Sequence, residues 1–540
     1  MDEVGNSGGE GGESSRRARA LMVLGTSSHV GKSLVTAALC RIFAQQGCRV
    51  APFKSQNMSL NSAATVEGLE IGRAQALQAE AAGVAASVHM NPILIKPSGE
   101  ASAQIVAHGR IWGQVSASEY HLRRVEELLP MVRASYDVLA EAHEVIVLEG
   151  AGSPAEINLK QHDIVNMRMA EMADARCVLV ADIDRGGVFA SLLGTIELLE
   201  PEERERIGGF IINKFRGDLS LLEPGVRMIE QRLNKPCLGI VPYLHGLALE
   251  EEDSVGLPMM TERGWASAAD ASAARRLRIA VVALPSFSNF TDFDSLREEE
   301  SVELLFCRSA ELMELADVVV LPGSKQTVDD LDWMRRSGLD RAVTKHAESG
   351  LVVGICGGMQ MLGEAIADPE GIEREGDVRG LGLLPIRTIM RAEKVTRSVS
   401  GMLCGEVLFG QRIATRSVVG YEIHVGETIY GTAARPFATL AAGAEMKAQW
   451  DGCLSEDMRV MGSYLHGVFD DDAFRHAFLL AARAFRQLSA EVPLTGWKAK
   501  REESLNRLAA EVSKAVDLRT LFGWVGQVYA PLALDLKEAQ

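Results

Sequence analysis

The chain has 540 residues, which is more than one ordinary domain holds and predicts two to four domains. Its hydrophobic fraction of 47% and charged fraction of 24% are typical of a globular protein and argue against general disorder. The formal net charge of −17 argues against nucleic acid or an anionic membrane as a partner. Any anionic ligand must therefore be held by a local cluster of donors.

The first 18 residues, MDEVGNSGGEGGESSRRA, are polar and rich in glycine and serine, which predicts a disordered tail. They lack the apolar core of a signal peptide. No later stretch has the roughly 20 uninterrupted apolar residues that a membrane-spanning helix needs. The eight cysteines form no Cys-x-x-Cys pair and no disulfide-like framework. We therefore expect a soluble, cytoplasmic protein in which most cysteines are small buried hydrophobic residues.

From residue 19 onward, short runs rich in β-branched residues alternate with helical stretches, as in a parallel sheet covered by helices. The first apolar run leads directly into a helical stretch at 31–47. The predicted strands of this block are 21–25, 48–53, 144–150, 177–183, 208–214 and 237–243. Residues 19–250 are therefore expected to form one α/β domain.

Residues 251–276 are first acidic and then alanine-rich, which indicates a linker. A second α/β block is expected over 277–475, and residues 476–540 are expected to be a helical extension without a reactive signature. The α/β segments of the second block are 277–285, 317–327, 351–363 and 459–469. The predicted fold class is thus α/β, with two such domains in one chain.

The stretch VLGTSSHVGKS places a glycine-rich turn between a strand and a helix and ends in Gly31, Lys32 and Ser33. Backbone N–H groups at the helix start and the Lys32 ammonium can face phosphates, and the Ser33 hydroxyl can bind Mg²⁺. The common phosphate loop has four residues between its first glycine and the closing Gly-Lys, whereas Gly25 and Gly31 enclose five. His29 within the loop is interpreted as a spacer. The sequence predicts a nucleotide site with an unusual loop.

A Mg·ATP site also needs an acidic residue at the end of a neighbouring strand. Glu149 follows the apolar run VIVL and precedes the small residues GAGS, which let the backbone approach a ligand. Lys54 follows the second strand and is expected to reach the same edge of the sheet, where it can neutralise a phosphate or a substrate carboxylate. We expect Ser33 and Glu149 to bind Mg²⁺ beside ATP.

The Gly-x5-Gly-Lys-[Ser/Thr] loop resembles that of dethiobiotin synthetase and its relatives, ATP-dependent ligases that phosphorylate a carboxylate or carbamate. Four further stretches resemble the cobyric acid synthase family, glutamine-dependent amidases of cobalamin biosynthesis: FKSQNMSLNS, EGAGSPAEINL, DIDRGGVFAS and NKFRGD. The resemblance implies that Gly31, Lys32 and Ser33 grip ATP, that Glu149 takes part in Mg²⁺ binding, and that adenine lies near Asn213.

In VVGICGGMQMLG, Cys356 lies between a β-branched strand and a helix and is flanked by Gly354, Gly357 and Gly358. A nucleophile on such a sharp turn is accessible, and the positive end of the helix dipole favours its thiolate. The glycines permit a strained backbone and a close approach of substrate. The sequence therefore predicts Cys356 as a nucleophile.

A nucleophilic cysteine needs a histidine to carry protons. His466 in VMGSYLHGVFD ends an apolar run near the close of the second block, which suits a general base. Together with Cys356 it resembles the class I glutamine amidotransferases in motif, order and separation. The resemblance implies oxyanion or glutamine contacts from Gly323 and Ser324 in VVVLPGSKQT, and from Gly357 and Gln360.

One departure from that family concerns the third member of the catalytic triad. The usual amidotransferase has glutamate two residues after the histidine, whereas here Gly467 and Val468 follow His466. The cobyrinate-type branch shares this absence, so we expect a Cys–His dyad with any orienting residue supplied from elsewhere. Our hypothesis is that Glu422 or His424 orients His466; both lie in GYEIHVGET, an element that resembles the same branch.

Together the two blocks predict a glutamine-hydrolysing, ATP-dependent ligase. The Cys356 thiolate would release ammonia from glutamine, with His466 moving the protons. Mg·ATP would convert a substrate carboxylate into an acyl phosphate, which ammonia displaces to form an amide. The resemblance implies a corrinoid substrate, adenosylcobyrinic acid a,c-diamide, amidated at its b, d, e and g carboxylates to adenosylcobyric acid. From motif position, Arg185, Asn289 and Asp292 are predicted to contact the corrin.

Two alternatives remain at this stage. One keeps the chemistry but changes the acceptor, as in cobyrinic acid a,c-diamide synthase or a cell-wall lipid amidase with related domains. The other is a non-catalytic ATP switch of the partition-ATPase type, which shares such loops but needs no nucleophile on a sharp turn. The stretch LPSFSNFTDFDSL favours the cobyric acid synthase family over the first alternative. The sequence leaves the oligomeric state open.

Overall fold

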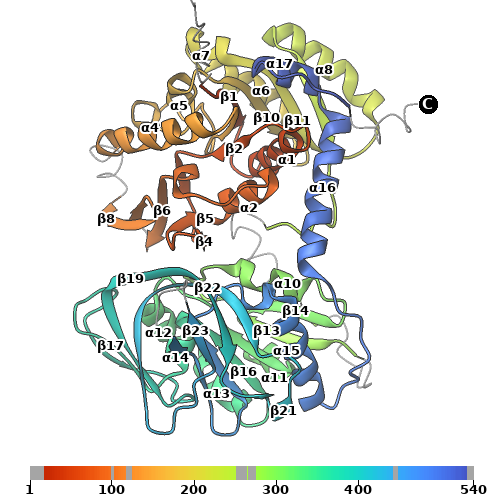
Figure 1. Cartoon of the computed structure of the whole chain (residues 1–540). Helices are drawn as coiled ribbons and strands as arrows, with labels where there is room; N and C mark the ends of the chain where they lie inside the picture. The colour runs from red at the N-terminus through yellow and green to blue at the C-terminus, as the bar shows by residue number, and fades with distance from the viewer. Residues whose placement is uncertain are drawn as a thin grey trace, which may run out of the picture.

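The computed structural model describes residues 17–98, 102–116, 125–250, 264–265, 275–441 and 448–531. Residues 1–16 of the predicted tail, and all of the predicted linker except 264–265 and 275–276, lie outside the described residues. Figure 1 shows two α/β domains, the N-terminal one above the second, with a long helix that runs beside the first domain and reaches the top of the second. Across the described ranges, every helix is too short or too polar to cross a membrane.

A six-stranded parallel sheet forms the centre of the first domain, with the strand order β12-β11-β10-β1-β9-β2. Its central strands are buried along their length because helices cover both faces of the sheet. The six strands predicted for this block are confirmed, with small shifts at their ends. They are β1 (Arg19–Gly25), β2 (Val50–Phe53), β9 (Val145–Glu149), β10 (Arg176–Asp182), β11 (Ile207–Phe215) and β12 (Cys237–Pro242).

Alternate residues of β1 face two separate apolar clusters on the two sides of this sheet. Met22 and Leu24 join one cluster, and Leu21 and Val23 join the other. This is the doubly covered arrangement that the alternating sequence pattern predicts. The helices of the first domain are α1 (Lys32–Gln45), α2 (Arg73–Ala82), α4 (Val125–Ala142), α5 (Met167–Met172), α6 (Val188–Glu197), α7 (Pro201–Arg206) and α8 (Leu219–Leu233).

Two small sheets extend the first domain toward the second, between β2 and α4 in the chain (Figure 1). The sequence patterns did not predict them. The larger has the order β3-β6-β7-β8, and β4 pairs with β5 in the smaller. Their strands are β3 (Gln56–Met58), β4 (Ser62–Ala64), β5 (Glu70–Gly72), β6 (Ile93–Ser98), β7 (Ser102–Ala107) and β8 (Arg110–Ser116). The short β4 strand becomes part of the contact between the domains.

The second domain has its own six-stranded sheet in the order β14-β13-β15-β16-β26-β25, and only β25 runs antiparallel to its neighbour. Its strands are β13 (Leu277–Val282), β14 (Val302–Cys307), β15 (Val318–Leu321), β16 (Leu351–Ile355), β25 (Cys453–Leu454) and β26 (Val460–Ser463). The helical segments around it are η5 (Phe290–Phe293), α10 (Asp294–Arg297), α11 (Ala310–Glu314), α12 (Thr327–Ser337), α13 (Leu339–Ala347), α14 (Gly357–Leu362), η6 (Val468–Asp470) and α15 (Asp472–Phe485).

A largely antiparallel sheet, also absent from the sequence prediction, lies against this α/β core. Its two long strands, β19 and β22, form a bulged pair. Its members are β17 (Ala365–Asp368), β18 (Gly376–Arg379), β19 (Ile386–Leu403), β22 (Ser417–Tyr430), β23 (Ala438–Ala441) and β24 (Gln449–Asp451); β20 (Val407–Leu408) and β21 (Gln411–Arg412) form a hairpin beside it. The stretch GYEIHVGET therefore lies on β22, along the side that faces the first domain (Figure 1).

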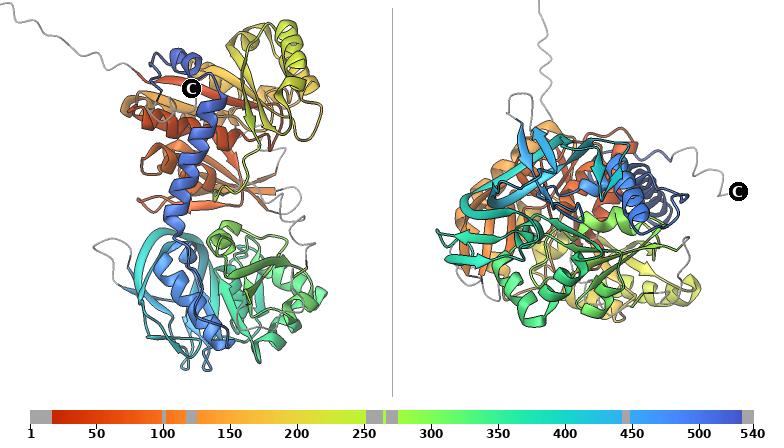
Figure 2. Two further views of the ribbon diagram at one scale, coloured as in Figure 1. Left: turned by 90° about the vertical axis from the view of Figure 1, so that its right-hand side faces the viewer. Right: turned by 90° about the horizontal axis from the view of Figure 1, so that it is seen from below.

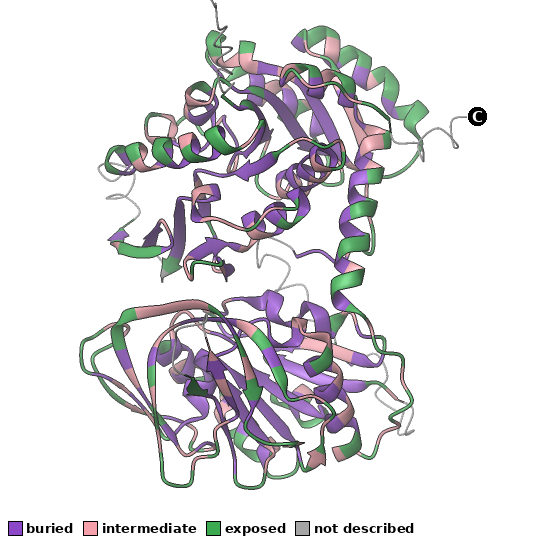
Figure 3. Ribbon diagram, in the orientation of Figure 1, coloured by how far each residue is buried: buried purple, intermediate pink, exposed green. Residues whose placement is uncertain are grey.

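The C-terminal helices α16 (Trp497–Ala515) and α17 (Leu518–Trp524) return to the first domain, as Figure 2 shows from a second direction. Leu505 and Leu508 of α16 join the apolar cluster of α1, and Phe522 of α17 stacks on Phe43 with ring centroids 4.2 Å apart. Figure 3 shows this inner side buried and the outer side exposed. The end of the chain thus fastens the second domain to the first.

Candidate functional site

The phosphate-loop segment leaves β1 and enters α1 in the predicted order. Gly31 has a φ of 97°, and a Cβ at this position would lie 2.2 Å from the amide nitrogen of Asn213. Only glycine fits both the backbone angle and the close approach. The Asn213 Nδ2 donates a hydrogen bond to the Val30 carbonyl at 2.8 Å. Asn213 therefore supports the loop, and its contact with adenine stays a prediction.

The backbone of His29, one of the five residues between Gly25 and Gly31, is fixed by a neighbouring side chain. His29 has a φ of 62°, unusual for a residue with a side chain, and its carbonyl accepts a hydrogen bond from Lys214 Nζ at 2.6 Å. The same ammonium binds Asp182 Oδ2 at 2.9 Å. The spacer interpretation of His29 thus fits the geometry. Asp182 and Lys214 were not among the predicted residues, although Asp182 ends β10 and Lys214 is the last residue but one of β11.

Glu149, at the end of β9, collects three donors in a buried cluster. Ser33 Oγ and Lys54 Nζ each lie 2.9 Å from its Oε1, and Gln78 Nε2 lies 2.5 Å from its Oε2. These side chains meet because β1, β9 and β2 are neighbours and all end at the same edge of the sheet. The sequence predicted Ser33 and Lys54 at this edge but missed Gln78, a buried polar residue on α2.

This cluster fits a magnesium ion. The Ser33 hydroxyl and the Glu149 carboxylate are hard oxygen donors, and Gln78 Oε1 is a buried acceptor without a hydrogen-bond partner among the described residues. Mg²⁺ usually takes one or two carboxylates and completes its shell with phosphate oxygens and water. No group of three or more His, Cys, Asp or Glu side chains forms a rival metal site among the residues described.

The Lys32 side chain folds back onto the phosphate loop. Its ammonium donates to the carbonyl oxygens of Ser27 at 2.9 Å and Gly152 at 3.0 Å. Gly25 lies beneath the loop, where a Cβ would come within 2.7 Å of Val30 Cγ2. The loop therefore combines a tightly packed glycine-rich turn, a lysine folded onto it and the start of α1, which is an arrangement suited to holding phosphates.

The predicted nucleophile occupies a strained turn between β16 and α14. Cys356 has φ 51° and ψ −110°, outside the favoured regions for a residue with a side chain. A Cβ on Gly358 would lie 2.0 Å from the carbonyl oxygen of Leu321, so glycine allows α14 to lie this close to β15. The thiol is 7% exposed and points its Sγ toward the Ile423 carbonyl at 3.6 Å. Strain of this kind aims a nucleophile at its substrate.

His466 lies beside this cysteine and has a carboxylate partner. The ring is 1% exposed and its charged form is stabilised by Cys356 and Asp292. Its Nδ1 lies 2.6 Å from Asp292 Oδ2, and the Gly467 N–H donates to Asp292 Oδ1 at 3.0 Å. Cys356, His466 and Asp292 therefore have the arrangement of a catalytic triad.

Opposing effects set the protonation of His466. Burial lowers the pKa of its imidazole, but the negative charges of Asp292 and then Cys356 more than offset burial and raise the pKa to about 10. These charges therefore favour the protonated ring, which can stabilise a cysteine thiolate beside it.

The hypothesis that Glu422 or His424 orients His466 is wrong. The Glu422 carboxylate binds Arg397 instead. The His424 ring stacks on Tyr464 with centroids 3.8 Å apart, and its Nδ1 faces the Gly426 carbonyl at 2.8 Å. Asp292 takes the orienting position although it lies 174 residues from His466 in the chain. A chain separation of this size leaves no local spacing signal.

The predicted corrin contacts of Asp292 and Asn289 also disagree with the structure. Both oxygens of Asp292 are engaged by the glutaminase-like centre, and the side chain is buried. Asn289 is buried too, and its Oδ1 accepts a hydrogen bond from the Ser62 N–H of the first domain at 2.9 Å. Arg185 differs, because its side chain is 63% exposed near Asp182. A corrin contact by Arg185 stays a prediction.

The predicted oxyanion loop lies next to the strained turn. A Cβ on Gly323 would lie 3.1 Å from His466 Cε1, and a Cβ on Gly357 would lie 3.0 Å from the Ser324 backbone nitrogen. The Ser324 hydroxyl is engaged by Asp330, since it donates to Oδ2 at 2.6 Å. The Ser324 backbone N–H is therefore the polar group of this residue that can face the turn of Cys356. Backbone N–H groups at such a position can stabilise a developing oxyanion.

Gln360 lies beneath the turn, with its backbone N–H bonded to the Cys356 carbonyl at 3.1 Å. Its amide donates to the Tyr464 hydroxyl at 3.2 Å and accepts from Thr327 Oγ1 at 3.3 Å. The residue is thus part of the wall next to the nucleophile, where its contact with substrate glutamine stays a prediction. Tyr464, which sequence reasoning missed, lies just before His466.

Comparison with known proteins places both halves of the chain in described families. The profile of the CobQ/CobB/MinD/ParA nucleotide binding domain matches residues 21–255, and that of the CobB/CobQ-like glutamine amidotransferase domain matches residues 278–474. A cobyric acid synthase of Moorella thermoacetica is 47% identical over 511 residues, covering 94% of this chain and 98% of the relative. One from Sorangium cellulosum is 47% identical over 522 residues, covering 94% and 99%. One from Clostridium botulinum is 44% identical over 508 residues, again covering 94% and 99%.

Proposed function

The chain belongs to the cobyric acid synthase family, and we propose from this premise that it amidates a corrinoid in cobalamin biosynthesis, with glutamine as the nitrogen source. The acceptor is adenosylcobyrinic acid a,c-diamide, whose b, d, e and g carboxylates become amides in adenosylcobyric acid. One observation carries the proposal: a Cys356–His466–Asp292 centre and a phosphate loop with its Glu149 cluster lie on one chain. A partition-type switch has no use for the first of these centres.

In the second domain, the Cys356 thiolate attacks the side-chain amide carbon of glutamine. The oxygen that becomes negative in the tetrahedral intermediate is stabilised by backbone N–H groups of the Gly323–Ser324 loop and the turn after Cys356. His466 donates a proton to the departing ammonia and then takes one from the water that hydrolyses the thioester. Asp292 holds the ring in the orientation for both transfers.

In the first domain, the loop N–H groups and Lys32 hold the phosphates of ATP, and Lys54 neutralises charge beside Glu149. Ser33 and Glu149 would hold Mg²⁺, which neutralises charge on the transferred phosphoryl group. A substrate carboxylate takes the γ-phosphoryl group to become an acyl phosphate. Ammonia from the second domain attacks this carbonyl carbon, phosphate leaves, and an amide remains.

Replacing Asp292 with asparagine tests the orienting carboxylate. Asp292→Asn is expected to lower kcat for glutamine hydrolysis about 10- to 100-fold, because the neutral amide holds the imidazolium less well. The KM for glutamine should change little. The charge of Asp292 raises the pKa of His466, so its removal should move the basic limb of the pH profile of kcat/KM to lower pH. An unchanged rate and an unchanged profile would together show that Asp292 has no orienting role.

The acceptor is tested by mass spectrometry of corrinoids incubated with the protein, glutamine and Mg·ATP. We expect four successive replacements of a hydroxyl by an amino group on the a,c-diamide. Two replacements on cobyrinic acid itself, and none on the a,c-diamide, would identify an a,c-diamide synthase instead. If no corrinoid is amidated while glutamine is hydrolysed, the acceptor belongs to another class, such as a cell-wall lipid.

A further inference from the structure

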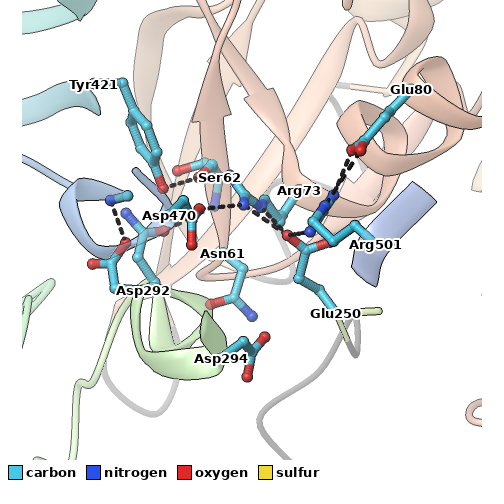
Figure 4. A network of polar contacts seen from close by, with 12 residues as sticks. Asn61, Ser62, Arg73, Glu80, Glu250, Asp292, Asp294, Tyr421, Asp470 and Arg501 are labelled. Atoms are coloured by element: carbon cyan, nitrogen blue, oxygen red, sulfur yellow. Dashed lines mark hydrogen bonds and ion pairs between the residues drawn. The ribbon is translucent and has the colours of Figure 1, made fainter. Parts of the chain in front are cut away.

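A short segment of the first domain, Asn61 and Ser62, contacts the second domain next to Asp292, the carboxylate that binds His466 (Figure 4). Asn61 Oδ1 accepts a hydrogen bond from the Phe290 N–H at 3.2 Å. The Ser62 N–H donates to Asn289 Oδ1 at 2.9 Å. Phe290 and Asn289 begin the turn that carries Asp292, whose own N–H donates to the Asn289 carbonyl at 3.0 Å. The first domain thus binds the start of the turn that carries Asp292.

The same segment also reaches the neighbour of the catalytic histidine. The ring of Tyr421 stacks on His466 with centroids 5.5 Å apart and an interplanar angle of 22°. The backbones of these residues exchange two hydrogen bonds, at 3.0 and 2.9 Å. The Tyr421 hydroxyl, at the other end of the side chain, donates to the Ser62 carbonyl at 3.2 Å (Figure 4). Tyr421 therefore connects His466 with the first domain.

The turn before Asp292 has a backbone that benefits from this support. Asn289 adopts φ 53° and ψ 48°, the left-handed region, which asparagine tolerates better than most residues but which still costs free energy. A residue keeps such a conformation when its surroundings determine it. Here the bond from the Ser62 N–H occupies the Asn289 side chain and holds it against the first domain.

A network of charged side chains fastens the domains beside this contact (Figure 4). Arg73 of α2 binds Glu250 at 2.7 Å and lies 3.6 Å from Asp470 of the second domain. Arg501 of α16 binds the same Glu250 and also Glu80 of α2. Arg73, Arg501 and Glu250 are largely buried, so removing one of them would leave an uncompensated charge. The Arg73–Asp470 contact joins this cluster to the second domain.

We propose that Asn61, Ser62 and Tyr421 are positioning residues of the glutaminase centre, so that this centre is complete only when the two domains are docked. The inference rests on the proposed function of Cys356 and His466. Asn61 and Ser62 fix the turn of Asp292, and Ser62 fixes Tyr421 against the face of His466. The first domain, which binds the nucleotide, thereby aligns the Asp292 carboxylate with the His466 ring in the second domain.

The experiment uses the full chain with Asn61→Ala and Tyr421→Phe combined. The first change removes the acceptor for the Phe290 N–H, and the second removes the hydroxyl but keeps the ring that stacks on His466. We expect kcat for glutamine hydrolysis to fall about 30-fold, since small misplacements of catalytic groups have effects of this size. The KM for glutamine and the rate of ammonia-dependent amidation should each stay within about twofold of wild type.

Ser398→Ala is the matched control. The Ser398 hydroxyl donates to the Thr65 carbonyl at 3.4 Å across the same interface. Ser398 of β19 is the cross-strand partner of Tyr421 of β22, so the control removes a hydroxyl next to Tyr421 while the backbone pairing, the Tyr421 hydroxyl and the Asp292 turn are unchanged. Its kcat for glutamine hydrolysis should be unchanged. In the double variant alone, the basic limb of kcat/KM should move to lower pH, because Asp292 sustains the raised pKa of His466 only while the pair is aligned.

Normal glutamine hydrolysis by the double variant would overturn the inference, as would an equal loss in the Ser398→Ala control. If the double variant also loses ammonia-dependent amidation, the single variant Tyr421→Phe is measured instead. A several-fold lower kcat for glutamine hydrolysis with intact ammonia-dependent amidation supports the inference. An unchanged kcat overturns it. Absence of glutamine hydrolysis in the wild-type protein would instead overturn the proposed function, so the two failures are distinguishable.

Discussion

Cys356→Ala is expected to abolish glutamine-dependent amidation and to leave ammonia-dependent amidation intact. The variant lacks the thiolate that is proposed to attack glutamine, and removal of a nucleophile lowers turnover by at least about 10⁴-fold. The nucleotide site is built from different elements, around Glu149 and Lys32 of the first domain, and does not use this thiol. Added ammonium salt at alkaline pH supplies the nitrogen directly.

The measurement compares corrinoid amidation with glutamine and with ammonium salt, together with glutamate release. Cys404→Ala is the matched control because Cys404 is an exposed free cysteine outside the site, and it should behave as wild type. If Cys356→Ala still releases glutamate from glutamine, another residue is the nucleophile. If a folded Cys356→Ala protein also fails with ammonia, the division into two separate sites is wrong.

Lys32→Ala is expected to give the opposite result, with amidation lost for both nitrogen donors and glutamine hydrolysis retained. Removing a positive charge that is already placed to stabilise a transferring phosphoryl group should lower the rate of amidation about 10²- to 10³-fold. The substitution also removes the two hydrogen bonds that Lys32 makes to the carbonyls of Ser27 and Gly152. Lys32 opens α1 of the first domain whereas Cys356 lies at the start of α14 in the second, so the thioester chemistry is expected to be unaffected.

Amide formation and phosphate release are measured with glutamine and with ammonium salt at saturating ATP. Lys345→Ala, which removes an exposed lysine of α13 paired with Glu314, is the control and should retain both activities. Wild-type amidation by Lys32→Ala would exclude the loop as the ATP site. Parallel loss of glutamine hydrolysis would mean that the glutaminase depends on an occupied nucleotide site.

The central strands of both domains could be predicted from the sequence because each is an apolar run buried on both faces. Leu21 to Leu24 and Val318 to Leu321 have no exposed surface, so no polar residue interrupts the signal. The long strands β19 and β22 gave no such signal. Exposed charged residues such as Arg391 interrupt β19, and a bulge breaks its register with β22.

For the C-terminal helices, the sequence predicts the secondary structure but not the surface against which they pack. Residues 476–540 were predicted to be helical, and α16 and α17 lie within this range, but a helical stretch does not by itself indicate which surface it will cover. In the structure Phe522 stacks on Phe43, and Arg501 binds Glu80 and Glu250. These contacts bring the end of the chain back to its beginning, and no spacing within the helices could have indicated them.

The sequence by itself determined the two loops that are proposed to carry the chemistry, since each is a contiguous run whose local backbone geometry follows from its residues. Gly31, Lys32 and Ser33 follow a strand and open a helix, and Cys356 lies on a turn that its flanking glycines permit. Only the tertiary structure decided which acid orients His466, because 174 residues separate Asp292 from that histidine. The packing of two domains brings these partners together, and the polar contacts that align them act over distances of a few ångströms in space, whatever their separation in the chain.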